Sequence, residues 1–215
     1  MTTLYLPKPF ERHELELALT LMREHPLAQM ISSDEDGQPY VTPLPLHAVS
    51  DGQTLSLLGH CAKANPHWRY LQARAQALVT FMGPQAYMSP SVYPDLVRVP
   101  TWSYVTIHCT VQATLIDDEA GKDRLLKQLI ADHEPAYAQQ WRTLGESYQQ
   151  KMLAGIVGFE LRVLAMQAKY KLNQHRPEAH AAMHQVYAQG NSQEQALALW
   201  MERLGMVASG LSAHE

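Results

Sequence analysis

The sequence predicts a mainly β protein in which one antiparallel sheet closes, or half closes, into a barrel with helices at its periphery. Six or so strand-like stretches follow one another in hairpin order, with turn signals between them. Helical stretches occur only at the start, before the last strand and at the end of the chain, so they do not alternate with strands as βαβ units require. This order is typical of antiparallel sheets and barrels.

The first helix follows an extended lead-in. Apolar residues recur at i, i+3, i+4 and i+7 from Leu15 to Met22, which predicts an amphipathic helix that ends near Pro26.

A two-stranded hairpin is then predicted over 27–33 and 38–49, around the turn sequence DEDG. Gly37 stands at the turn position that requires a positive φ. Pro43 and Pro45 in the second strand have no N–H to donate to a neighbouring strand. We therefore expect this strand at a sheet edge, with backbone groups left free for a ligand.

A strand over 54–60 is followed by a candidate anion site. Asn65 and Pro66 favour the start of a short helix. His60, Lys63 and the backbone N–H groups before this helix are the best candidates in the chain for binding a phosphate group. The alternative is a capped helix beside an exposed, solvated Lys63.

The stretch 83–104 concentrates aromatic rings, hydroxyl groups and prolines. Its prolines fix φ and remove donors, so a strand over 75–83 is expected to stop and a stiff loop to enter a second strand over 101–116. The aromatic and hydroxyl side chains suit a flat ligand with polar edges. The alternative is a stiff loop whose rings pack over a sheet edge.

The rest of the chain is predicted to be helical except for one long strand over 156–172, where apolar residues alternate. Asp117 or Asp118 is expected to cap a helix through about residue 132, and further helix is expected with breaks near Pro135 and Gly145. Two short helices are predicted after residue 177, and 207–215 as a tail. In the helix that Asp117 or Asp118 is expected to cap, the large aliphatic residues are expected to form the inner face: Leu125, Leu126, Leu129 and Ile130.

Composition excludes several classes of protein. The 215 residues carry two cysteines and no metal-binding CxxC spacing, which favours a reducing compartment, with the cytoplasm as the expected location. Residues 1–14 lack the apolar run of a signal peptide, and the sequence shows no apolar run long enough to span a membrane, so a soluble protein is expected. A net charge of −4 and a pI near 6.2 give no overall basic footprint for nucleic acid.

Familiar catalytic motifs are also missing. No GxSxG, P-loop or GxGxxG element is present, so hydrolase and nucleotide-kinase functions have no support. His180 and His184 have metal-pair spacing but lack the Glu of a zincin, and a solvated helix face is expected instead.

Four further histidine and cysteine positions have no assigned chemistry. Cys61 beside His60 is expected to be structural, because sequence neighbours usually point apart and no third group orients the pair. His108 and Cys109 are expected inside a strand, at a packed core or an edge position, and His47 is unassigned.

Five ordered motifs carry a family resemblance. GHCAKANPHW, GPQAYMSPSVY, VPTWSY, IVGFELRV and KLNQHRP resemble, in order and distance, the PaiB-type FMN-binding transcriptional regulators. The resemblance covers residues 4 to about 177. This chain departs from the family pattern at Val92, where an aromatic residue is expected, and at Asn173 and His175, where Ser and Asn are more frequent.

The resemblance implies an FMN-binding split barrel, similar to pyridoxamine-phosphate-oxidase-like flavoproteins, that forms a homodimer with FMN at the interface. The domain would span 1–176 with a helical insertion at 118–154, and 177–215 would be a C-terminal helical extension. Segment 60–63 would hold the phosphate, and the proline-interrupted strand would face the flavin ring. The implied cofactor-binding residues, with the subunit that contributes each left open, are Thr42, Pro43, Leu44, His60, Cys61, Ala62, Lys63, Asn65, Gln85, Tyr87, Ser89, Thr101, Trp102 and Tyr104.

Three functions are compatible with this resemblance. The first is a transcriptional regulator that binds FMN, with DNA as a partner by resemblance only, because the sequence lacks a helix-turn-helix with a basic recognition helix. The second is a flavin reductase or oxidase acting on a small molecule. The third is a haem-binding protein. Catalytic residues cannot be assigned from the sequence, and no metal site is expected.

Overall fold

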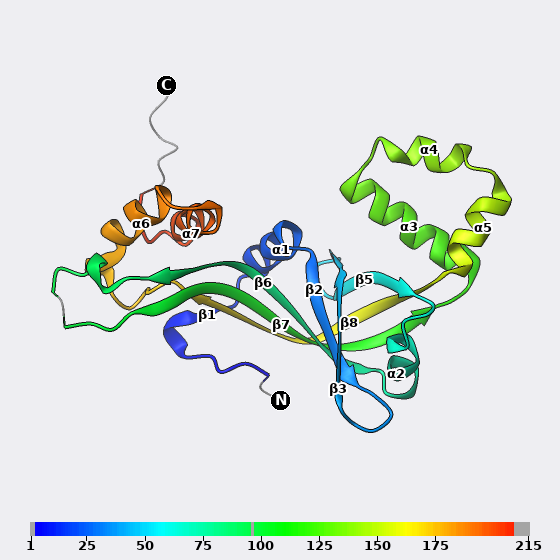
Figure 1. Cartoon of the computed structure of the whole chain (residues 1–215), viewed down its shortest axis with the longest axis horizontal. Coiled ribbons are helices and arrows are strands. Elements are labelled where there is room, and N and C mark those ends of the chain that lie inside the picture. Colours follow the sequence, from blue (N-terminus) through cyan, green and yellow to red (C-terminus); the bar gives the residue numbers. More distant parts are fainter. Residues whose placement is uncertain (1–2, 96, 209–215) are drawn as a thin grey trace. The chain divides into compact units, whose positions relative to one another are not determined.

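The computed structural model describes residues 3–95 and 97–208 (Figure 1). These residues form two compact units, each built from separate parts of the chain. Unit 1 takes the described residues of 1–14, 82–107 and 167–215, and unit 2 takes 15–81 and 108–166. Three long strands continue from one unit into the other, so each unit contains part of all three.

Within the described residues, eight strands form one sheet in the order β3-β2-β6-β7-β8-β5-β4, with β1 paired to β8. The strand pairs with a defined register are all antiparallel, as predicted. The strands are β1 (Glu11–Arg12), β2 (Leu27–Ser33), β3 (Pro39–Pro45), β4 (His47–Ser50), β5 (Leu55–Ala62), β6 (Gln76–Met88), β7 (Thr101–Ile116) and β8 (Ile156–Lys171).

The β2–β3 hairpin confirms the turn and edge predictions. Gly37 has a φ of 81°, and β3 is the last strand on its side of the sheet. At an edge, the missing N–H of proline removes no hydrogen bond to a neighbouring strand. The second strand was expected to be continuous over 38–49, which is wrong. Leu46 separates β3 from β4, because its N–H donates to the carbonyl of Pro26 at 2.9 Å.

Strand β6 is longer than predicted. It was expected to stop at residue 83 but continues through Pro84 to Met88. Beyond the proline the burial alternates, with Gln85 and Tyr87 exposed and the residue after each of them buried. This two-residue period buries an apolar side chain at every second position, and that gain outweighs the loss of one backbone donor.

The helices of unit 2 begin and end close to the predicted positions (Figure 1). Asp118 caps α3, since its side chain accepts from the N–H of Gly121 at 2.7 Å. The predicted inner face of α3 is only partly correct, because Leu125 is buried while the other three aliphatic residues stay partly exposed. The helices are α1 (Leu15–Glu24), α2 (His67–Ala73), α3 (Glu119–His133), α4 (Tyr137–Thr143) and α5 (Glu146–Ala154).

Unit 1 contains the two predicted C-terminal helices, α6 (His180–Ala188) and α7 (Ser192–Arg203). Trp200 of α7 packs on Tyr170 of β8 with ring centroids 5.4 Å apart, and both side chains are fully buried. The hydroxyl of Tyr187 on α6 donates to Ser103 Oγ of β7 at 2.9 Å. These contacts attach both helices to the strands of the unit, and the predicted domain boundary after 176 stays a prediction.

Short 3₁₀ turns η1 (Lys8–Phe10), η2 (Pro90–Val92) and η3 (Pro177–Ala179) complete the described chain. From residue 209 the predicted tail lies outside the described residues. Of the helices in the part of the chain that the structure describes, none has the length and apolar character needed to cross a membrane.

Candidate functional site

The predicted cofactor residues fall into two groups, one in each unit. Segments 42–44 and 60–65 belong to unit 2, whereas the predicted residues between 85 and 104 belong to unit 1. Each group is described by itself below.

Lys63 lies in the turn between β5 and α2. Its backbone is fixed on both sides, because its N–H donates to the Gly155 carbonyl at 2.8 Å and its carbonyl accepts from Trp68 Nε1 at 3.0 Å. The side chain is half exposed, and its Nζ lies 3.8 Å from Asp117 Oδ2. An exposed ion pair of this length contributes at most about 1 kcal/mol. The ammonium group can therefore exchange this carboxylate for another anion.

The backbone near Lys63 offers fewer free donors than the sequence suggested. The N–H of Asn65 donates to the carbonyl of Ala62, and the N–H of His67 donates to Asn65 Oδ1 at 3.0 Å. The helix begins at His67, one residue later than expected, and has seven residues. The N–H groups of Lys63, Asn65 and His67 are therefore already bonded within the protein. Any anion at this turn would be held mainly by the Lys63 side chain.

His60 and Cys61 precede this turn on β5. Burial raises the pKa of the Cys61 thiol and lowers the pKa of His60. The Cys61 thiol is therefore not activated, as predicted. His60 Nδ1 is buried and has no hydrogen-bond partner within the described residues. A buried polar atom without a partner is costly, so His60 retains an unused hydrogen-bonding position.

A histidine network that sequence reasoning missed connects β2, β3 and α2. The ring of His67 is fully buried, with Ser32 Oγ 2.8 Å from Nε2 and Thr42 Oγ1 2.7 Å from Nδ1. Asn65 Nδ2 donates to the same Thr42 hydroxyl at 3.3 Å. Burial lowers the pKa of His67 to about 4, so the ring is neutral at neutral pH. The Thr42 hydroxyl is thus committed to the protein, which leaves the backbone of β3 as the ligand-facing group expected there.

In unit 1, Trp102 is the centre of the predicted aromatic group. Its Nε1 donates to Gln85 Oε1 at 2.9 Å, and Tyr87 meets its ring edge-on at a centroid distance of 6.3 Å. Tyr87 and Trp102 are both about half exposed. Ser89 instead caps the turn η2, since its hydroxyl accepts from the N–H of Ser91. The structure therefore brings three of the predicted residues into one exposed aromatic surface.

Lys171 is a second residue that sequence reasoning did not single out. Its Nζ donates to the Thr101 hydroxyl and to the Trp102 carbonyl, the latter at 2.7 Å. Lys169 and Lys171 both lie over the ring of Tyr104, at 5.3 and 5.8 Å from its centroid. Desolvation and the nearby Lys169 lower the pKa of Lys171. The motif KLNQHRP contains this lysine and was the available signal.

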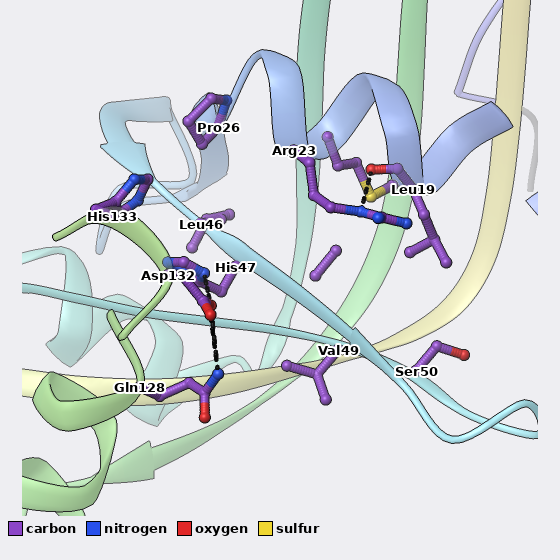
Figure 2. A pocket seen from close by; sticks show the side chains of 12 residues that line it. Leu19, Arg23, Pro26, Leu46, His47, Val49, Ser50, Gln128, Asp132 and His133 are labelled. Carbon is purple, nitrogen blue, oxygen red and sulfur yellow. Dashed lines mark hydrogen bonds and ion pairs between the residues drawn. The ribbon is translucent and has the colours of Figure 1, made fainter. Parts of the chain in front are cut away.

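His47 lines a cavity of about 570 Å³ in unit 2 (Figure 2). Its Nδ1 lies 2.6 Å from Asp132 Oδ2, and the ring of His133 packs edge-on at 4.9 Å. Figure 2 shows this pair between β4 and the end of α3, with Gln128 bonded to the same carboxylate. None of the predicted cofactor residues lines this cavity. It is therefore not part of the cofactor hypothesis.

The His180 and His184 prediction needs correction. His180 is buried and its Nε2 meets the Asn173 carbonyl at 3.0 Å, while His184 Nε2 lies 2.8 Å from Glu202 Oε1. The two rings attach α6 to the turn after β8 and to α7, so they do not form a solvated face. Within the described residues, no group of three or more potential ligands could hold a metal ion.

Solved structures with this architecture define the class of protein. A FAD and haem binding protein from Mycobacterium smegmatis matches with a TM-score of 0.61 and 19% identity, over 76% of this chain and 74% of its own. The flavocytochrome Anf3 from Azotobacter vinelandii matches with a TM-score of 0.60 and 18% identity, over 76% and 70%. At this identity the likeness shows the fold, which is a split β-barrel.

Sequence comparison then gives the family. Residues 4–165 match the family described as "Putative FMN-binding domain". Protease synthase and sporulation protein PAI 2 of Bacillus subtilis is 33% identical over 180 residues, which cover 81% of this chain and 84% of that protein. The chain belongs to this FMN-binding family and is PaiB-like, as its motifs indicated. FMN is the cofactor that membership assigns to it.

Proposed function

We propose that this protein is a PaiB-like transcriptional regulator that acts in the cytoplasm as an FMN-binding homodimer. The observation that carries the proposal is the 33% identity to PAI 2 over 81% of the chain. FMN, when bound, supplies a flavin ring that can accept and release electrons, so its redox state could change the regulator's output. Two free, buried cysteines suit a reducing compartment.

The residues of this chain fit the cofactor. Lys63 offers a half-exposed ammonium group with only a weak ion pair, and His60 has a buried nitrogen for which the described residues provide no partner. Trp102 offers a half-exposed flat ring. In our proposal Lys63 and His60 hold the FMN phosphate, the β3 backbone faces the flavin, and an aromatic group contributed by one of the two subunits covers its ring.

The phosphate assignment can be tested by comparing FMN with riboflavin, which lacks the phosphate. FMN is expected to bind more tightly than riboflavin. Lys63→Ala should weaken the binding of FMN by about 1 to 3 kcal/mol and leave the binding of riboflavin unchanged. Lys151→Ala, which removes an exposed lysine of α5, is the matched control. Equal affinities for FMN and riboflavin would show that the phosphate site is wrongly placed.

A homodimer is supported by exposed apolar residues in unit 1 and by the open edge of β3. Val97, Val99 and Trp102 are 85%, 78% and 48% exposed, which is unusual for apolar side chains that gather in one segment. Sedimentation of the protein over a dilution series, with and without FMN, tests this. A monomer that binds FMN with full affinity at every dilution would refute a site shared between subunits.

The regulatory role is tested by titrating labelled promoter duplex from the source genome with the protein, with and without FMN. Saturable binding whose affinity changes with FMN is expected. Rapid bleaching of the bound flavin by a nicotinamide cofactor, together with no sequence-dependent DNA binding, would instead favour the oxidoreductase alternative.

A further inference from the structure

Unit 1 contains a half-open cavity of about 260 Å³ beside the turn that follows β8. This volume is below the range of about 300 to 1,000 Å³ that is usual for drug-sized ligands, so the cavity suits a small molecule. The walls come from the end of β6, the loop before β7, the first residues of β7 and the β8 turn. The lining residues with polar or charged groups that matter here are Arg98, Thr101, Lys171, Asn173 and Arg176.

The charged residues that line the cavity are cations. Arg98, Lys171 and Arg176 contribute to its wall, and no Asp or Glu does so among the described residues. Arg98 is paired, at 3.0 Å from Asp95 and 4.0 Å from Glu178. Lys171 and Arg176 have no ion pair within the described part of the chain, and Lys171 donates only to neutral oxygens. The cavity therefore has an excess of positive charge.

Two buried donors in the cavity wall lack partners. Asn173 is 7% exposed and its Oδ1 accepts from the Tyr93 hydroxyl at 3.0 Å, but its Nδ2 has no partner within the described residues. Arg98 Nε is also buried, and no partner for it is found in the part of the chain that the structure describes. Leaving such a donor unpaired is unfavourable, because the atom has lost its hydrogen bonds to water without gaining one in the protein. Both atoms are donors, so the missing partner is a hydrogen-bond acceptor.

The backbone conformation of Asn173 is a further indication of a ligand site. Its φ is 67°, and it is the one non-glycine with positive φ among the described residues. Such a conformation is costly and recurs at ligand sites. Two contacts to its carbonyl oxygen stabilise this conformation of Asn173. The oxygen accepts from the N–H of Arg176 at 3.0 Å, and His180 Nε2 lies 3.0 Å from it.

The remaining wall is apolar or aromatic, formed by Phe10, Met88, Val99 and the ring of Trp102. We propose that this cavity binds a small monocarboxylate with a flat apolar body. The two carboxylate oxygens would accept from Asn173 and the cationic side chains, and the apolar body would lie against Trp102. A carboxylate matches the cavity because it offers two acceptors and one negative charge in a small volume.

The experiment is a calorimetric titration of the FMN-saturated protein with benzoate, benzamide and inorganic phosphate. FMN-loaded protein is used because Thr101 and Trp102 also belong to the proposed cofactor set. Benzoate is expected to bind saturably, once per chain. Benzamide, which has the same shape without the charge, should bind at least about tenfold more weakly, and so should phosphate. Equal binding of benzamide, or tighter binding of phosphate, would overturn the proposal.

Variants identify the site. Lys171→Met and Arg176→Gln should each lower the affinity for benzoate at least about tenfold, whereas Lys151→Met should leave it unchanged. Arg176 is exposed, so its variant tests the site even if the Lys171 variant fails to fold. Wild-type benzoate affinity in Arg176→Gln would overturn the proposal, and so would displacement of benzoate by FMN. Benzoate binding by a protein that does not bind FMN would uphold this inference while the proposed function fails.

Discussion

Replacing His67 by glutamine should remove a pH dependence that is built into unit 2. The wild-type ring is fully buried between Ser32 and Thr42, at 2.8 and 2.7 Å. Glutamine is polar but cannot replace both hydrogen bonds or take up a proton. At neutral pH the free energy of unfolding should fall by about 1 to 3 kcal/mol, because at least one of the two half-buried hydroxyl groups loses its hydrogen bond to the ring.

The pH effect follows from the pKa of His67. Burial lowers it from 6.5 to about 4. Above pH 6.5 the ring is neutral in the native and unfolded chains, so it contributes no pH dependence there. As the pH falls from 6.5 to about 4, the unfolded chain binds a proton that the native chain does not, and the free energy of unfolding decreases. The total loss, complete below about pH 4, is about 3 kcal/mol, at about 1.4 kcal/mol per pH unit.

Urea denaturation followed by tryptophan fluorescence, between pH 7.5 and 4.5, measures this effect. Over that interval the free energy of unfolding of the wild-type protein should fall by about 2 to 3 kcal/mol more than that of His67→Gln. Burial also lowers the pKa of His47, His60 and His175, but these residues are present in both proteins and cancel in the difference. Parallel stability curves for the two proteins would refute a neutral, buried His67.

Two further predictions concern α7 and the cysteines. Asn191 caps α7 in a capping box with Glu194, so Asn191→Ala should lower the free energy of unfolding by about 1 kcal/mol in a thermal or urea melt, while Asn191→Asp should not. Both thiols are buried, and burial raises the pKa of Cys109 to about 12, so neither cysteine should react with a thiol reagent at neutral pH until the protein is unfolded. Stoichiometric labelling of the native protein would contradict that burial.

Local patterns gave most of the secondary structure. The positive φ of Gly37, the breaks before α4 and α5, and the edge position of β3 follow from turn chemistry and from the missing N–H of proline. The places where prediction failed were set by partners elsewhere in the chain. Strand β6 continues past Pro84 because its alternate residues are buried, and β3 ends because Leu46 bonds to Pro26.

The candidate site divides in the same way. By itself the sequence determined the antiparallel fold class, the family and its FMN, because ordered motifs and two-residue periodicity are properties of the chain read along its length. Only the tertiary structure decided which polar groups meet. Ser32, Thr42 and His67 form one network, and Lys171 reaches Thr101, although these residues are 25 to 70 positions apart. Such pairings depend on strand register and packing, which no local pattern encodes.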